Sequence, residues 1–195
     1  MNPYHELIKN RSLVAKNYAA MTLNATTFRM FQKGQADDIR KFLIGRIGDG
    51  SELSRCRSWN DYTRNLAAII RAFQREFRMS KTKRKPKFGQ AAKVVNLYVK
   101  HLLMLPDYLV LYNRRRLESH AHVPLDRQIL GRMWGERGKK GNFHLELCTS
   151  GIRYRPELRT LEKPDYIRIQ RVLASAVRKS AIPAIAYDYL YALRE

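Results

Sequence analysis

The chain has few cysteines, few acidic residues and no long apolar run, and each shortage excludes a class of protein. Cys56 and Cys148 are its only cysteines and lie far apart, so neither a disulfide framework nor a CxxC motif is available. No run of about 18 apolar residues occurs, which predicts that no helix spans a membrane. The first residues, MNPYHELIKNRS, lack the apolar centre of a signal peptide. We therefore expect a protein of the reducing cytoplasm without a membrane partner.

The shortage of acidic residues leaves a large positive charge. The 195 residues include 38 Lys and Arg against 17 Asp and Glu, which gives a formal net charge of +21. Hydrophobic residues make up 45% of the chain, so the charge belongs to a sequence that can fold and not to a disordered basic tail. This combination predicts a polyanionic partner, most simply nucleic acid; a ribosome or an acidic membrane surface is the alternative.

Apolar residues recur at helical spacing along most of the chain. Helices are expected over 4–20, 26–47, 90–105 and 125–134, with two more opening at Pro164 and Pro183; DYLVLY (107–112) is read as helix and NRRRLE (113–118) as loop. Ser58 and Asp61 predict the start of another helix, whose apolar stripe contains Tyr62, Leu66, Ile69, Phe73 and Phe77. Glycines interrupt 135–156, where FHLEL alternates with period two. We predict one compact, monomeric all-α domain over 1–195, with a Gly-rich irregular insert and a small hairpin near 141–156.

The longest window without an acidic residue, 77–106, begins with a basic connector between two predicted helices. The connector, RMSKTKRKPKFG, carries Lys81, Lys83, Arg84, Lys85 and Lys87 and ends at Gly89. Such a loop can follow a phosphate backbone and release counterions, and a glycine at the next helix start can bring backbone N–H groups close to a phosphate. The alternative is a solvated lysine loop. The triplet 114–116, three arginines, is a second candidate for phosphate contact.

One isolated carboxylate, Asp126, stands at the head of a predicted helix and is the only acidic residue between positions 118 and 136. It either caps the helix or stabilises positive charge that forms on a substrate held by a cationic surface. Lys93, Asn96 and Lys100 are three and four residues apart, which predicts that they share one helix face. Lys93 then faces the ligand of the basic connector, or it is an ordinary surface lysine.

Two segments resemble parts of the helix-hairpin-helix DNA glycosylases. FGQAAKVVNLYVKHL is similar to the helix after the hairpin that grips the DNA backbone, and places Lys93 where the strand-cutting members have a lysine. HVPLDRQIL is similar to the segment in which an aspartate follows a Val-Pro step, and places Asp126 there. The separation of 33 residues resembles the archaeal 8-oxoguanine branch. KRKPKFG replaces the usual Leu-Pro-Gly-Val-Gly hairpin, and the four-cysteine iron–sulfur loop of some members is missing.

The resemblance implies a helix-hairpin-helix-like element and an enzyme that flips a damaged or modified base out of double-stranded DNA and excises it, in repair or in defence against phage. Asp126 would stabilise the charge on the sugar, and Lys93 would attack the sugar carbon in a glycosylase that is also a lyase. Asn96, Lys100 and Trp134 are candidates for the base pocket. We expect no cofactor and no metal, since His120, His122, His144 and Cys148 match no zinc spacing. The alternative is a non-catalytic, basic nucleic-acid-binding protein in which Asp126 is only a cap.

Overall fold

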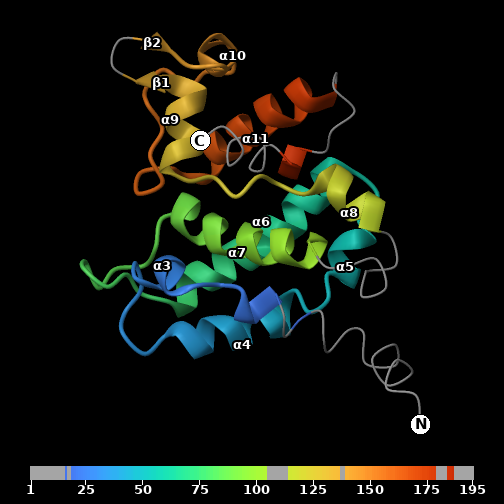
Figure 1. The fold of residues 1–195 in the computed structure, drawn as a ribbon, viewed down its shortest axis with the longest axis vertical. Helices are drawn as coiled ribbons and strands as arrows, with labels where there is room; N and C mark the ends of the chain where they lie inside the picture. The colour runs from blue at the N-terminus through green and yellow to red at the C-terminus, as the bar shows by residue number, and fades with distance from the viewer. Residues whose placement is uncertain (1–15, 17–18, 105–113, 137–138, 179–183, 187–195) are drawn as a thin grey trace.

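The computed structural model describes residues 16, 19–104, 114–136, 139–178 and 184–186, and within them the chain is mostly helical. Helices α6 and α7 lie in the middle of the molecule, α3 and α4 on one side of them, and α9, α10 and α11 on the other (Figure 1). The elements in chain order are α3 (Ala25–Phe28), α4 (Ala36–Arg46), α5 (Ser51–Ser54), α6 (Trp59–Glu76), α7 (Phe88–Leu103), α8 (Arg114–His120), α9 (Arg127–Trp134), β1 (Gly135–Glu136), β2 (Lys139–Lys140), α10 (His144–Thr149), α11 (Lys163–Arg178) and the 3-10 turn η2 (Ala184–Ala186).

The central pair α6 and α7 follows from local sequence signals and from burial. The Ser58 hydroxyl accepts a hydrogen bond from the Asp61 N–H at 3.1 Å, which confirms the expected start of α6. Helix α6 buries one stripe, whereas α7 buries residues all around its axis because it is packed between α6 and α11. Apolar side chains from every layer then join in one continuous cluster of buried residues.

The layer of α3 and α4 corrects the expectation of one helix over 26–47. Residues 29–35 leave the helical path: Gly34 has a φ of +91°, and Phe31 forms an isolated bridge with Met79 after α6. That bridge brings the Phe31 ring to 5.5 Å from Phe73, edge to face, within an aromatic group that also contains Phe42 and Phe77. The break therefore supplies a core side chain that a continuous helix would direct elsewhere.

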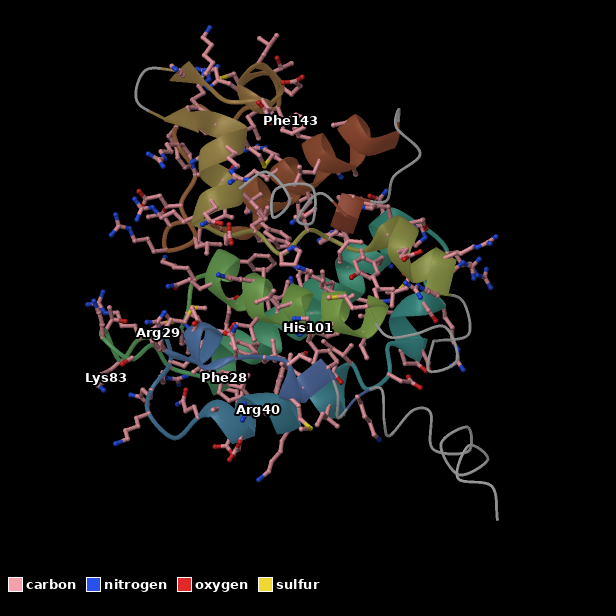
Figure 2. The ribbon with its side chains drawn as sticks, viewed as in Figure 1. Phe28, Arg29, Arg40, Lys83, His101 and Phe143 are labelled. Atoms are coloured by element: carbon pink, nitrogen blue, oxygen red, sulfur yellow. The ribbon has the colours of Figure 1, made fainter. Side chains whose placement is uncertain are left out.

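Arg40 of α4 joins this layer to the chain before α3. Its guanidinium lies 4.7 Å from the centre of the Phe28 ring and donates hydrogen bonds to the carbonyls of Ala20 and Leu23. Figure 2 labels the side chains of Phe28 and Arg40.

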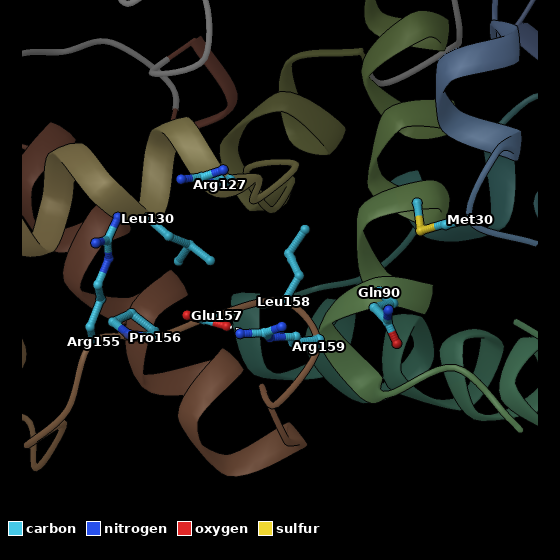
Figure 3. A pocket seen from close by; sticks show the side chains of 9 residues that line it. All are labelled: Met30, Gln90, Arg127, Leu130, Arg155, Pro156, Glu157, Leu158 and Arg159. Atoms are coloured by element: carbon cyan, nitrogen blue, oxygen red, sulfur yellow. Dashed lines mark hydrogen bonds and ion pairs between the residues drawn. The ribbon is translucent and has the colours of Figure 1, made fainter. Parts of the chain in front are cut away.

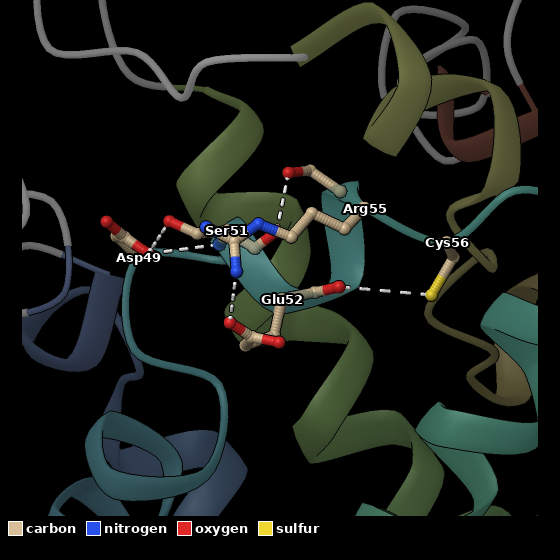
Figure 4. A network of polar contacts seen from close by, with 6 residues as sticks. Asp49, Ser51, Glu52, Arg55 and Cys56 are labelled. Carbon is tan, nitrogen blue, oxygen red and sulfur yellow. Dashed lines mark hydrogen bonds and ion pairs between the residues drawn. The ribbon is translucent and has the colours of Figure 1, made fainter.

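Beyond α4, the short helix α5 begins in a tight turn. The Asp49 carboxylate accepts hydrogen bonds from the N–H and the hydroxyl of Ser51, and Arg55 pairs with Glu52 at 2.8 Å (Figure 4).

Helix α8 corrects a second expectation, because NRRRLE is mostly helical and not a loop. Leu117 is the buried anchor of α8, which packs against α5 and α6. The Arg114 side chain donates to the Leu103 carbonyl at 2.8 Å and pairs with Glu118 at 3.3 Å, so the arginine triplet begins with a residue that has an internal structural role.

The layer of α9, α10 and α11 corrects the position of the hairpin. Strands β1 and β2 pair antiparallel, Gly135 with Lys140, so the hairpin lies at 135–140 and not near 141–156. The alternating segment FHLEL belongs to α10 instead, where Leu147 is buried and Leu145 is 75% exposed. Two apolar residues of the alternation, Leu145 and Leu147, therefore lie on different faces of α10, and the period of two does not indicate a strand.

Other expectations for this layer are confirmed. Ile129, Leu130 and Met133 of α9 are buried, and α11 opens beside Pro164 with Tyr166, Ile169 and Leu173 in the core. The expected all-α class holds for the described residues. The helix expected over 4–20 lies almost wholly outside them, as do DYLVLY and most of the last helix. None of the helices within the described ranges is long and apolar enough to cross a bilayer.

The start of α7 is fixed by a close backbone approach that corrects the role expected for Gly89. Its N–H donates to the Leu161 carbonyl at 2.9 Å, and the residue is buried. A Cβ at this position would lie 2.8 Å from the Leu161 Cβ and 3.0 Å from the Leu158 oxygen. The expected N–H for a phosphate is therefore already used, and glycine is needed here so that α7 can pack on 158–161.

Gly89→Ala should lower the free energy of unfolding by about 1–3 kcal/mol, because the added methyl group overpacks this contact. Urea denaturation measures the change. The matched control is Gly45→Ala in α4, where nothing lies within 4 Å of the added Cβ. There the same substitution should raise stability by about 0.5–1 kcal/mol through helix propensity. Equal effects at the two sites would contradict the packing at Gly89.

Candidate functional site

A pocket of about 460 Å³ lies where α7, α9 and the segment 155–159 meet (Figure 3). Gln90 comes from the first turn of α7, and Arg127 and Leu130 come from the first turn of α9. Met30 and the segment 155–159 complete the lining. The pocket therefore collects the starting ends of two helices that are remote in the sequence, and its volume is within the range of small-ligand sites.

The pocket combines apolar walls with a cationic rim. Met30, Leu130, Pro156 and Leu158 supply apolar surface, and the charged groups are three arginines and one carboxylate. Glu157 is paired with Arg159 at 2.6 Å between Oε2 and Nε, so its charge is balanced inside the rim. With three arginines and one carboxylate, the lining carries a net positive charge. This lining suits a ligand that has a flat apolar part and an attached anionic group.

Asp126 stands beside the pocket and is the cap of α9. Its Oδ1 accepts a hydrogen bond from the Ile129 N–H at 2.8 Å, and the side chain is half-buried. The residue directly precedes Arg127, which lines the pocket, but Asp126 itself does not line it. The capping interpretation is confirmed as geometry. One carboxylate oxygen is engaged in the cap.

Lys93 lies one helical turn after Gln90, so it is close to the pocket end of α7. It is half-buried, and no described carboxylate pairs with it. Lys100 is two further turns along the same helix and is also half-buried, which places it away from the pocket end.

Two of the expected base-pocket residues are in other places. Asn96 is 0% exposed and donates to the Tyr166 hydroxyl at 2.7 Å, so it lies inside the core and not on an open face with Lys93 and Lys100. Trp134 is half-buried, with its ring 4.5 Å from that of His144, and it contributes to the packing of α9 on α10. Neither residue lines the pocket.

Sequence reasoning missed a buried polar network around His122. The Thr63 hydroxyl donates to the Trp59 carbonyl at 2.7 Å, so it accepts from His122 Nε2–H at 3.0 Å. His122 Nδ1 then carries no proton and accepts from the Tyr166 hydroxyl at 2.9 Å, which itself accepts from Asn96. Burial lowers the pKa of His122 to about 3, so the imidazole is neutral in the folded chain.

The network holds the extended segment 121–125 that leads to Asp126. The side-chain amide of Gln170 in α11 forms two hydrogen bonds with the same segment. Its oxygen accepts from the Val123 N–H at 2.9 Å, and its nitrogen donates to the Val123 carbonyl at 2.8 Å. Because α11 holds both His122 and Val123, and Thr63 of α6 holds His122 as well, the cap at Asp126 has a defined position. A histidine four residues before the aspartate was the only sequence signal for this arrangement.

The basic connector after α6 is a closed, exposed turn. The Met79 N–H donates to the Arg84 carbonyl at 2.8 Å, and the Lys83 N–H donates to the Met79 carbonyl at 3.0 Å. Lys83 has a φ of +56° at the tip and projects at the edge of the molecule in Figure 2. Buried Pro86 ends the turn and its carbonyl accepts from Gln74 of α6 at 2.9 Å.

The cations of this turn differ in their partners. Lys81, Lys83, Arg84 and Lys85 are exposed, and no described carboxylate pairs with them. Lys87 instead forms an ion pair with Glu162 at 2.7 Å, which links the start of α7 to the segment before α11. Four of the five expected phosphate-binding cations are therefore displayed together, and the fifth has a partner within the chain.

The histidines and Cys148 do not form a metal centre in the part of the chain that the structure describes. His144 Nδ1 lies 3.0 Å from the Trp134 carbonyl, and its Nε2 lies 3.8 Å from the Cys148 Sγ. His122 is enclosed in the core network. No group of three or more His, Cys, Asp or Glu side chains among the described residues is arranged to hold a metal ion.

Comparison with known proteins gives no match. No family model, no curated protein and no solved structure is similar to the chain. Function is therefore inferred from the residues and the geometry described above.

The buried neutral His122 predicts a loss of stability in mild acid. Its pKa in the folded chain is below that of an unfolded histidine, about 6.5, so the unfolded state binds the extra proton as the pH falls. Stability from this group is full above about pH 6.5 and decreases toward pH 3. Between pH 7 and pH 5 the loss should be about 2 kcal/mol, measured by urea denaturation at both values.

His122→Gln removes the titrating group and should remove that part of the pH dependence, whatever its effect on stability at pH 7. The control is His144→Gln, which leaves the His122 network intact and should keep the part of the dependence that comes from His122. His120, whose pKa burial lowers, contributes equally to all three proteins. A pH dependence in His122→Gln as steep as that of the unchanged chain would contradict the network.

Proposed function

We propose that the chain binds double-stranded DNA and excises a damaged or modified base, which it turns out of the duplex into the pocket between α7, α9 and 155–159. The observation that carries the proposal is that each candidate catalytic residue is adjacent to, or one turn from, a residue that lines this pocket, although neither of them lines it. Asp126 precedes Arg127, and Lys93 follows Gln90 by one turn. The apolar walls fit the faces of a base, and the arginine rim fits the phosphates beside it.

DNA binding follows from the charge distribution. The net charge of +21 and the four displayed cations of the 81–85 turn supply the electrostatic attraction that dominates binding to a phosphate backbone. The turn lies between α6 and α7 (Figure 1), and Gln90 in the first turn of α7 lines the pocket, so the proposed backbone contact and the proposed base site are adjacent along the chain.

Asp126 has the electrostatic role in the proposed reaction. Cleavage of the N-glycosidic bond leaves positive charge on the sugar, which a fixed carboxylate stabilises. In the hydrolytic form, water adds to C1′ and the base departs with a proton. In the lyase form, the Lys93 amine attacks C1′ through its nitrogen lone pair, and the base departs with a proton. The C1′–O4′ bond then opens, the remaining proton on nitrogen passes to O4′, and the resulting imine is later hydrolysed by water.

A non-catalytic nucleic-acid-binding protein is the second candidate. The observation that favours it is the hydrogen bond from the Ile129 N–H to Asp126. This cap explains why a carboxylate stands at the position without any catalytic role. Incubation with a panel of damaged and phage-modified duplexes, scored for free base and abasic sites, separates the two candidates. The same panel separates repair from phage defence. In either case we propose a cytoplasmic monomer that works without a cofactor.

The 81–85 turn should contribute directly to the salt dependence of duplex binding. Lys81→Gln with Lys85→Gln should reduce the slope of log Kd against log salt by about two, because each lysine releases about one counterion. The control is Arg115→Gln with Arg116→Gln, which removes the same charge from the arginine triplet. The proposed function does not keep this triplet as a phosphate contact, because α8 lies at the opposite side of Figure 1 from the turn. The control should change the slope little. Fluorescence anisotropy measures both, and equal slopes in the two double variants would refute this contact.

Asp126→Asn should separate capping from catalysis. Asparagine caps helices about as well as aspartate, so folding and DNA binding should be retained. Base release should fall at least about 100-fold, because the charge opposite the sugar is lost. Single-turnover assays on the active substrate measure the rate. Asp126→Ala is the control for the cap, with a further loss of about 1 kcal/mol of stability. Unchanged base release in Asp126→Asn would reduce this residue to a cap.

Lys93 should form a covalent adduct if it is the nucleophile. Borohydride should then trap a protein–DNA adduct through reduction of the imine at C1′, and Lys93→Ala should abolish it. Lys100→Ala is the control on the same helix and should leave the adduct. Base release from an active preparation without any trapped adduct would assign the attack to water.

A further inference from the structure

A second hollow adjoins the pocket on the other side of Arg127. It has a volume of about 620 Å³ and lies between α9 and the β1–β2 hairpin. Arg127 and Arg132 of α9 and Lys139 and Lys140 of β2 line it, together with the amide side chains of Gln128 and Asn142 and three glycines. This hollow is called the basic groove below.

The charge of the basic groove is of one sign. None of its lining residues is acidic. Lys139 and Lys140 are exposed, and neither they nor Arg127 pairs with a carboxylate among the described residues. Four cations around one hollow repel one another, and this repulsion is relieved when phosphates enter. The groove therefore favours a ligand that carries several negative charges.

The groove is a rigid feature because backbone contacts build its floor. A Cβ on Gly141 would lie 2.4 Å from the Arg132 oxygen, and a Cβ on Gly135 would lie 2.1 Å from the Lys139 oxygen. Backbone N–H groups of 141 and 142 donate to the carbonyls of Trp134 and Arg132, each at 3.0 Å. The hairpin is thereby fixed against the end of α9, so the backbone positions from which the two lysines and the two arginines extend are defined relative to one another.

The position of the groove indicates the kind of anion. Arg127 lines both the groove and the pocket, so a chain that has one unit in the pocket can continue into the groove without leaving the cationic surface. Cations on both walls of an open hollow suit successive phosphates better than one small anion. We propose that the basic groove binds the DNA backbone next to the nucleotide that enters the pocket. This inference rests on the proposed function, since it requires that the chain binds DNA.

The test is Lys139→Gln with Lys140→Gln. These exposed side chains have no structural partners among the described residues, so the fold should be kept, and circular dichroism checks it. On a short undamaged duplex, between about 50 and 200 mM salt, the slope of log Kd against log salt should fall by about two. The matched control is again Arg115→Gln with Arg116→Gln, which should keep the slope of the unchanged chain. A slope in the groove variant that equals the control overturns the proposal.

The result distinguishes this inference from the proposed function. If the unchanged chain does not bind duplex DNA in a salt-dependent manner, the proposed function itself fails. If it binds and the 81–85 variant lowers the slope while the groove variant does not, only the groove inference fails. Calorimetry with inorganic phosphate tests the alternative that the groove binds a single small anion. Phosphate binding that is lost in the groove variant, with an unchanged duplex slope, identifies a small-anion site and also overturns the proposal.

Discussion

The hydroxyl of Tyr166 is the point on which the arrangement of the site depends. It accepts from Asn96 of α7 and donates to His122, so a single oxygen joins α11, α7 and the segment that precedes Asp126. All three side chains are buried, where a missing partner would leave a desolvated polar group at a cost of about 1–3 kcal/mol. The two helix starts that form the pocket are therefore held in register by hydrogen bonds in the core, in addition to the packing of Gly89 on 158–161.

This arrangement assigns different tasks to the faces of α7. Asn96 belongs to the core network, Gly89 to the packing on 158–161, and Lys93 to the end near the pocket. A helix that is buried on nearly every side has little surface left for a ligand, so the candidate site is restricted to its first turns. In α9, the buried side likewise leaves only the other side of the helix for a ligand, and that side carries the residues that line the basic groove.

The features that were predictable from the sequence are those with local causes. The cap at Ser58, the apolar stripe of α6 and the cap at Asp126 each depend on residues within about one turn. The interruption at 29–35 was not predictable, because Phe31 leaves the helix to reach Met79 and Phe73 across the fold. Asn96 was misplaced for a similar reason: spacing shows that it shares a sector with Lys93, but only tertiary structure shows that α11 covers that sector. The composition of the sequence indicates the basic connector, but its closure at Met79 depends on backbone hydrogen bonds that composition does not reveal.

The closed turn at 79–84 has a thermodynamic consequence. Its backbone is already fixed by its own hydrogen bonds and by the tie from Gln74 to Pro86, so little main-chain entropy remains to be lost when a polyanion arrives. A free lysine loop of the same composition would lose about 1–2 kcal/mol for each residue that it orders. The cost of ordering this turn belongs to folding and not to association, and its lysines meet the ligand as a preorganised surface.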